Sequence, residues 1–141
     1  PSTMQQRPAY DHDVVAEVLA FLRDRTRELV DAGIRGERIM LDPGFGFGKT
    51  LEHNLTLLDR LETITAEGAP VLVGMSRKSM LGKVTGRDVA HRMPASVAAA
   101  TVAMMKGAAV VRAHDVPETV DAARLVRALE QVQGNREHND G

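Results

Sequence analysis

Apolar residues recur at helical spacing in several segments of the chain. In residues 11–32, Val14, Val18, Leu22 and Leu29 follow one another at intervals of four or seven positions, which predicts an amphipathic helix that ends near Gly33. Similar but shorter patterns predict helices over 54–61 and 94–106, and a last helix that ends at about Val132. The polar residues 134–141 include two glycines, and we expect them to form a disordered tail.

Three short apolar segments separate these helices. Residues 38–42, 70–75 and 108–113 are apolar without alternation, a pattern typical of parallel strands that are covered on both faces. The predicted order is therefore one helix followed by three strand–helix units. This order predicts an α/β fold with parallel strands and right-handed connections, in one domain over residues 1–133.

Composition narrows the classes of function. Charged residues make up 26% of the chain and the net charge is −1, so neither nucleic acid nor an anionic membrane is an expected partner. The absence of cysteine excludes disulfides and thiolate metal sites. Apolar segments are too short to cross a bilayer, and the start does not resemble a signal peptide. We expect a soluble, cytoplasmic protein. Because the chain begins with Pro1 rather than Met, we also expect it to be part of a longer product.

Each predicted strand is followed by residues capable of binding or catalysis. The first strand leads into 42–49 (DPGFGFGK), the second into 74–79 (GMSRKS), and the third into 112–115 (RAHD). In parallel α/β proteins, ligands bind at the carboxyl ends of the strands. The sequence therefore predicts one site that combines a carboxylate, glycines, an aromatic ring, and lysine, arginine and histidine side chains.

The glycine-rich segment 42–49 does not match the common nucleotide-binding loops. A Walker loop requires four residues between its glycines, whereas Gly44 and Gly48 are separated by three. The evenly spaced Gly44, Gly46 and Gly48 also differ from the dinucleotide-binding pattern. The glycines are better explained as a tight backbone turn beside Asp42 that presents either Phe45 or Phe47.

Together, the segment 42–49 with Asn54, the segment 76–79, and Arg112-x-His114-Asp115 resemble the three carboxyl-terminal signatures of dihydropteroate synthases. The resemblance extends over nearly the whole chain. It implies strands six to eight of a TIM-type (β/α)₈ barrel, which would be incomplete here because such a barrel takes roughly 250 residues.

The resemblance also implies roles for individual residues. Asp42 holds the pterin, and a carboxylate suits this role because it accepts two parallel hydrogen bonds from an amino group and a ring N–H. Phe47, beside Gly46, packs near the pterin ring, although simple core packing is the alternative. Lys78 lies between pterin and p-aminobenzoate. The remaining implied contacts with the substrates come from Gly74, Ser76, Arg77, Ser79, Arg112 and His114.

Within that remaining set, Ser79 and Ser76 match positions near the p-aminobenzoate carboxylate, with turn capping as the alternative. Arg77 stacks or holds its loop. Arg112 and His114 match the positions that bind the diphosphate leaving group, and their alternation along a strand lets both side chains point the same way.

The implied reaction joins 6-hydroxymethyl-7,8-dihydropterin diphosphate to p-aminobenzoate, with Asp42, Lys78, Arg112 and His114 as the catalytic residues of this segment. The family also implies Mg²⁺ with a protein ligand outside this segment, sulfonamide sensitivity and a homodimer formed through the last helices. Because five strands are absent, we expect the isolated chain to be inactive and to expose a sheet edge and apolar helix faces.

Two other functions compete with this interpretation. A corrinoid methyltransferase that uses methyltetrahydrofolate shares the barrel and the pterin site, but it has no diphosphate to bind. The Arg112/His114 pair therefore favours the synthase. The second alternative is a non-catalytic half-barrel that binds pterin or serves in assembly.

Overall fold

The computed structural model describes residues 13–139. The first helix, α1 (Val14–Asp31), begins at Asp13, whose side chain accepts hydrogen bonds from the backbone N–H groups of Val15 and Ala16. Gly33 follows the helix with a φ of 96°, a conformation that glycine adopts without strain. The helix predicted over 11–32 is thus confirmed for its described part, and residues 11 and 12 lie outside the described range.

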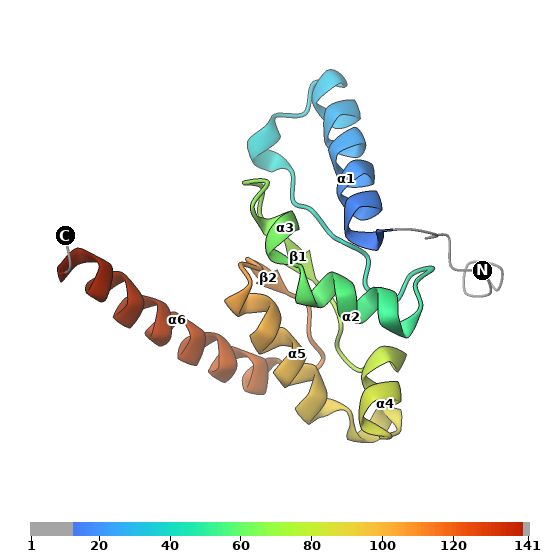
Figure 1. Ribbon diagram of the computed structural model, residues 1–141, viewed down its shortest axis with the longest axis vertical. Helices are drawn as coiled ribbons and strands as arrows, with labels where there is room; N and C mark the ends of the chain where they lie inside the picture. The colour runs from blue at the N-terminus through green and yellow to red at the C-terminus, as the bar shows by residue number, and fades with distance from the viewer. Residues whose placement is uncertain (1–12, 140–141) are drawn as a thin grey trace.

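The remaining described elements are helices interrupted by two very short strands (Figure 1). In chain order they are the 3₁₀-helix η2 (Gly36–Arg38), α2 (Leu51–Asp59), α3 (Glu62–Thr65), β1 (Leu72–Val73), α4 (Ser79–Thr85), the 3₁₀-helix η3 (Val89–His91), α5 (Met93–Met105), β2 (Val110–Val111) and α6 (Val116–Asn139).

The three predicted strands run parallel and lie side by side in chain order. β1 pairs with β2 through Leu72 opposite Val110 and Val73 opposite Val111, and Leu41 forms a parallel bridge with Val71 on the other side of β1. Regular pairing covers fewer residues than the apolar runs 38–42, 70–75 and 108–113. Apolar composition predicts burial, whereas a strand also requires a hydrogen-bonded neighbour. The α/β class with parallel strands is confirmed.

Several helix boundaries differ from the prediction. The helix expected from residue 54 starts at Leu51, because Thr50 accepts the backbone N–H of His53 and forms a capping box with it. The sequence pattern missed α4 and η3, which are short, and short helices carry little periodicity. α6 continues beyond Val132 to Asn139, so residues 134–139 are helical where we predicted disorder. The domain boundary at 133 stays a prediction.

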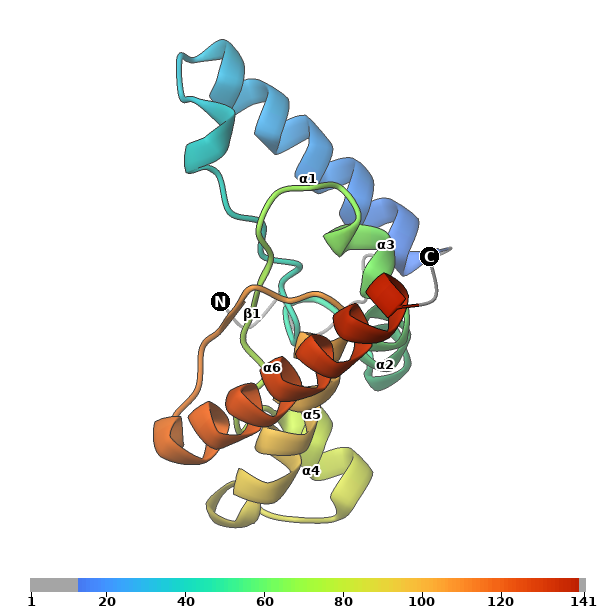
Figure 2. The same ribbon diagram turned by 90° about the vertical axis from the view of Figure 1, so that its left-hand side faces the viewer.

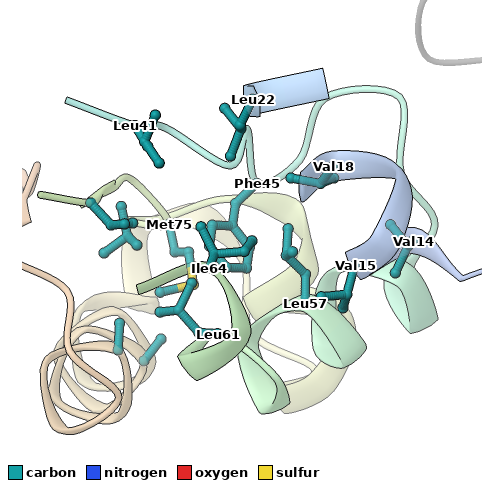
Figure 3. Close-up of a cluster of buried hydrophobic side chains, with 14 of the residues drawn as sticks. Val14, Val15, Val18, Leu22, Leu41, Phe45, Leu57, Leu61, Ile64 and Met75 are labelled. Carbon is teal, nitrogen blue, oxygen red and sulfur yellow. The ribbon is translucent and has the colours of Figure 1, made fainter. Parts of the chain in front are cut away.

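The main core lies where α1, α2, α3 and α4 meet the strands. Phe45, from the loop after Leu41, is 1% exposed and lies between side chains of α1, α2 and α3 (Figure 3). Leu57, Leu61 and Ile64 are fully buried beside it. This packing fixes the start of the glycine-rich loop, because Phe45 anchors it to the helices.

The last helix extends away from this core. α6 packs across α5 and then continues past the body of the molecule (Figures 1 and 2). Apolar side chains of the two helices remain exposed: Val102, Met105, Val116, Val120, Leu125, Leu129 and Val132. The expected exposure of apolar helix faces is thus observed.

Among residues 13–139, none of the helices combines the length and the apolar character that crossing a bilayer requires.

Candidate ligand site at the strand ends

The loops that follow the three strands lie at one edge of the short sheet. Asp42 follows Leu41, residues 74–78 follow β1, and residues 112–115 follow β2. Because the strands are parallel neighbours, their carboxyl ends meet at the same edge. A cavity of about 390 Å³ opens there, and its lining comes from Gly74, Ser76, Lys78, Arg112, Ala113 and His114.

The parallel register of β1 and β2 continues into their loops. The paired residues of the strands are 38 positions apart, as in Leu72 and Val110. The side-chain contacts Ser76–His114 and Arg77–Asp115 keep the same separation of 38. Gly74 and Arg112, which also face each other, fit the same register. Side-chain contacts between the two loops therefore keep the alignment of β1 and β2 beyond the last paired residues of the strands.

Arg112 occupies space that the absence of a side chain at Gly74 leaves open. A Cβ atom on Gly74 would approach Nη2 of Arg112 to 3.0 Å and Nε to 3.1 Å. The φ of Gly74 is not positive, so the backbone there does not require glycine. The close approach of the guanidinium gives the physical reason for glycine at this position.

Ser76 holds His114 at two points. The Ser76 Oγ accepts the backbone N–H of His114 at 3.1 Å and lies 2.8 Å from the His114 Nδ1. This second contact orients the imidazole, because it fixes one ring nitrogen and leaves Nε2 for another partner. The sequence placed Ser76 and His114 at neighbouring strand ends but did not predict this contact between them.

Lys78 connects the loop after β1 to the glycine-rich loop. Its Nζ donates to the backbone carbonyl of Phe45 at 2.6 Å and lies 4.8 Å from the centre of the Phe47 ring. Partial burial lowers the pKa of the Lys78 ammonium, as does the nearby positive charge of Arg112, while the negative charge of Asp42 raises it.

The side chain of Asn54 supports the glycine-rich loop through hydrogen bonds. This side chain is 3% exposed; its Oδ1 accepts the N–H of Gly46 at 2.8 Å and its Nδ2 donates to the carbonyl of Thr50 at 2.9 Å. Gly46 has a φ of 84°, and a Cβ there would meet Lys78 Cδ at 3.2 Å. The loop presents Phe47, which is 65% exposed, whereas Phe45 is buried. This settles which phenylalanine the loop displays.

Two further charged residues, Asp42 and Lys49, bind the backbone of the glycine-rich loop. Asp42 is exposed and accepts the N–H of Gly44 at 2.9 Å, which stabilises the turn. Lys49 donates from Nζ to the carbonyls of Gly44 at 2.8 Å and Phe47 at 3.1 Å. Burial lowers the pKa of Lys49, the charge of Asp42 raises it, and the charge of Lys78 lowers it.

Arg77 and Ser79, which were predicted to contact the substrates, do not line the cavity. The guanidinium of Arg77 points to Asp115, with Nη2 to Oδ1 at 2.8 Å, and Arg77 does not line the cavity. Ser79 is exposed as the first residue of α4. Sequence reasoning did not predict that Asp115 binds Arg77, nor that Ser96 and Arg92 bind the Arg77 backbone, because such support depends on contacts between residues distant in sequence.

The arrangement is suited to a polar, anionic ligand. Lys78 and Arg112 bring positive charge to the cavity, His114 adds a ring nitrogen, and Asp42 offers a carboxylate at the neighbouring strand end. Phe47 adds an exposed ring beside Lys78. The fold and site therefore define a parallel α/β protein with a ligand site at the carboxyl ends of its strands.

Residues 1–114 match the family model described as pterin binding enzyme. The chain belongs to this family.

Individual relatives are dihydropteroate synthases. The chain is 52% identical over 131 residues to the enzyme of Neisseria meningitidis serogroup C, a match that covers 92% of this chain and 46% of the relative. The crystal structure of the Yersinia pestis enzyme with a sulfonamide drug complex superposes with a TM-score of 0.88 at 43% identity, covering 92% of this chain and 47% of that one.

A second similar structure contains a bound pterin compound. The enzyme of Xanthomonas albilineans in complex with 7,8-dihydropteroate has a TM-score of 0.84 at 46% identity, covering 87% of this chain and 47% of the other. The chain thus spans about half the length of the relatives it matches.

Proposed function

We propose that the chain is the carboxyl-terminal half of a dihydropteroate synthase, with strands six to eight of a (β/α)₈ barrel and its loops. The enzyme joins 6-hydroxymethyl-7,8-dihydropterin diphosphate to p-aminobenzoate, giving 7,8-dihydropteroate and diphosphate. The observation that carries the proposal is the cavity in which Lys78, Arg112 and His114 converge from two neighbouring strand ends. An anionic leaving group matches this concentration of cationic donors.

The pterin binds on the side of the glycine-rich loop. Asp42 accepts hydrogen bonds from the pterin amino group and ring N–H, each contributing roughly 1.5–3 kcal/mol because the acceptor is charged. Phe47 stacks near the ring, and Gly46 lets the loop pass close to Lys78. Lys78 donates to the pterin from the opposite side, and exchanges its present bond with the Phe45 carbonyl for this contact.

The leaving group and the second substrate bind on the side of β2. Arg112 offers a planar pair of donors to the diphosphate and His114 adds a donor from its ring. Gly74 gives the Arg112 guanidinium its space. Ser79 and Ser76 lie toward the carboxylate of p-aminobenzoate, and Arg77 holds the loop between them.

These contacts support a displacement without a protein nucleophile. The bond between the pterin methylene carbon and the diphosphate oxygen breaks, and its electron pair leaves with the diphosphate. Arg112 and His114 stabilise that departing charge, while Asp42 stabilises the positive charge spread over the pterin. The amine nitrogen of p-aminobenzoate forms the new bond and then loses its proton.

Magnesium is implied by the family, and the described residues do not by themselves provide a site for it. Within residues 13–139, no group of three or more His, Cys, Asp or Glu side chains is arranged to bind a metal ion. No step above passes through the metal. Mg²⁺ held by residues outside the chain stays a prediction.

The test compares the chain with the protein encoded by its complete reading frame. Purified chain is titrated with inorganic diphosphate and with a dihydropterin by calorimetry, and both proteins are assayed for dihydropteroate formation. We expect the chain to bind ligand weakly and to turn over little or no substrate, and the full product to be active and sulfonamide-sensitive. Absence of dihydropteroate synthesis by a folded full-length product would refute the proposal.

Titrations with pterin diphosphate and with methyltetrahydrofolate, together with the assay of the full-length product, distinguish the two alternatives. A corrinoid methyltransferase would bind methyltetrahydrofolate in preference to pterin diphosphate, whereas Arg112 and His114 favour the diphosphate. A non-catalytic half-barrel would bind pterin and remain inactive in the full-length product as well.

We also propose a homodimer in the cytoplasm. The exposed apolar residues of α5 and α6 support the dimer, since exposed apolar side chains on two neighbouring helices favour association. The cytoplasmic location depends on the family resemblance alone. Sedimentation of the full-length product, with Leu125→Lys as the interface variant, tests the dimer: the variant is expected to shift the protein toward monomer.

A further inference from the structure

Arg77 adopts an unusual backbone conformation between two residues of the cavity. Its φ of 57° is the only positive value at a residue other than glycine in the part of the chain that the structure describes. A residue other than glycine in the left-handed region is energetically unfavourable, because its Cβ crowds the following carbonyl oxygen. Ser76 and Lys78, its neighbours in sequence, both line the cavity, whereas Arg77 does not. The turn at Arg77 thus separates two ligand-facing side chains.

Both polar groups of the Arg77 backbone are bound by side chains. The N–H donates to Ser96 Oγ at 2.9 Å, and the carbonyl accepts from Arg92 Nη1 at 2.9 Å. Ser96 is 6% exposed, and its own hydroxyl donates to the Arg92 carbonyl at 2.7 Å. Arg92 and Ser96 come from the start of α5, so the amino-terminal turn of one helix holds the conformation of the loop.

The side chain of Arg77 is held from the other strand end. Nη2 and Nε of Arg77 donate to the two oxygens of Asp115 at 2.8 and 3.3 Å. The Asp115 side chain is only 17% exposed. Because Asp115 follows His114 directly, this ion pair and the Ser76–His114 contact tie the two loops together at adjacent positions.

We propose that Asp115, Ser96 and Arg92 are positioning residues that hold the Arg77 turn, so that Ser76 and Lys78 face the cavity and His114 keeps its orientation. The inference rests on the proposed function, because it takes the cavity to be the substrate site. The three residues act through Arg77 and contact no substrate. Arg77 itself serves as the anchor of the loop, with its guanidinium directed away from the ligand.

The experiment uses two pairs of variants. Asp115→Asn removes the charge that binds Arg77, and Asp121→Asn is its control, because Asp121 forms an exposed ion pair with Arg124 on the same helix. Ser96→Ala removes the acceptor of the Arg77 N–H, and Ser96→Thr retains a hydroxyl. The hydrogen exchange rate of the Arg77 amide, measured by NMR relative to core amides, reports the turn without any ligand.

We expect Asp115→Asn and Ser96→Ala to accelerate Arg77 exchange and to weaken the binding of inorganic diphosphate roughly tenfold, since misplacement of a binding group by about 1 Å costs up to a hundredfold in catalysis. In the full-length product the same variants are expected to raise KM for pterin diphosphate more than they lower kcat. Asp121→Asn and Ser96→Thr should retain the exchange rate and the affinity of the unmodified protein.

Exchange and affinity in Asp115→Asn and Ser96→Ala that equal those of the controls would overturn the proposal. If Asp115→Asn does not fold, the Ser96 pair decides the matter alone. If the folded full-length product does not make dihydropteroate, the proposed function fails, and the exchange rates still decide whether these residues hold the turn.

Discussion

The guanidinium of Arg112 lies against the Cα of Gly74, with Nη2 only 3.0 Å from where a Cβ atom would stand. The two residues belong to neighbouring strand ends, and the contact directs Arg112 into the cavity. The backbone of Gly74 does not require a positive φ. Glycine at this position therefore matters because it leaves space for the Arg112 guanidinium.

The first prediction concerns this contact. Gly74→Ala should displace the Arg112 guanidinium by a few tenths of an ångström or more, and so weaken diphosphate binding several-fold, while thermal stability changes little because the arginine end is flexible. Isothermal calorimetry and thermal melting measure the two effects. Gly36→Ala is the matched control, since its Cβ would have no neighbour within 4 Å. Unchanged affinity in Gly74→Ala would show that Arg112 does not bind the ligand from this position.

The second prediction concerns the titration of Lys78. Burial lowers the pKa of its ammonium below the ordinary value of 10.5, so a carbon-13 NMR titration of the lysine Cε should give a midpoint below 10.5. Arg112→Gln should raise this midpoint, because a repelling positive charge is lost. Asp42→Asn should lower it further, because an attracting negative charge is lost. Midpoints that move in the same direction in both variants would contradict the charge arrangement.

The same shift has a consequence for stability. A lysine whose pKa is lower in the folded state contributes stability that is present above its unfolded pKa and is lost as the pH falls through the folded pKa. The contribution from Lys78 therefore increases between its lowered pKa and about 10.5. Lys78→Met should flatten the pH dependence of the free energy of unfolding in that window, as denaturant melts at several pH values will measure.

The third prediction concerns the buried amide beneath the glycine-rich loop. Asn54→Ala should destabilise the chain by roughly 1–3 kcal/mol, because the Gly46 N–H and the Thr50 carbonyl lose their side-chain partner. Urea denaturation measures the change. Asn54→Asp retains the acceptor for Gly46 and loses the donor to Thr50. Equal stability of Asn54→Ala and the unmodified chain would mean that water or another group replaces the amide.

The fourth prediction separates backbone strain from steric contact with two matched glycines. Gly33 and Gly107 have nearly equal φ values of 96° and 97°, but a Cβ at Gly107 would meet Thr65 Oγ1 at 2.8 Å, while one at Gly33 would meet nothing within 4 Å. Gly33→Ala should cost roughly 1–2 kcal/mol from the left-handed backbone alone. Gly107→Ala should cost distinctly more. Equal losses in thermal denaturation would exclude the contact with Thr65 as a source of strain.

The sequence predicted the first helix more accurately than it predicted the lengths of the parallel strands. The periodicity of Val14, Val18 and Leu22 predicted α1 because one apolar face packs on the core. The apolar run 70–75 predicted burial correctly, but regular pairing at β1 covers only Leu72–Val73. The length of a strand depends on its neighbours, which a local pattern does not contain. α4 and the extension of α6 were missed for the related reason that short helices and helix ends are determined by a few caps and contacts.

The sequence by itself determined which polar and charged residues stand at the strand ends that form the candidate site. Asp42, Lys78, Arg112 and His114 each follow an apolar strand, and in parallel strands the carboxyl ends meet at one edge. Their family resemblance added the implied substrates.

Only the tertiary structure decided how these side chains are held. The register of 38 residues sets Ser76 against His114 and Arg77 against Asp115. Packing between the helices buries Phe45, while Phe47 stays exposed. The physical reason is that orientation arises from contacts between residues far apart in the chain, and spacing within one segment does not specify those contacts.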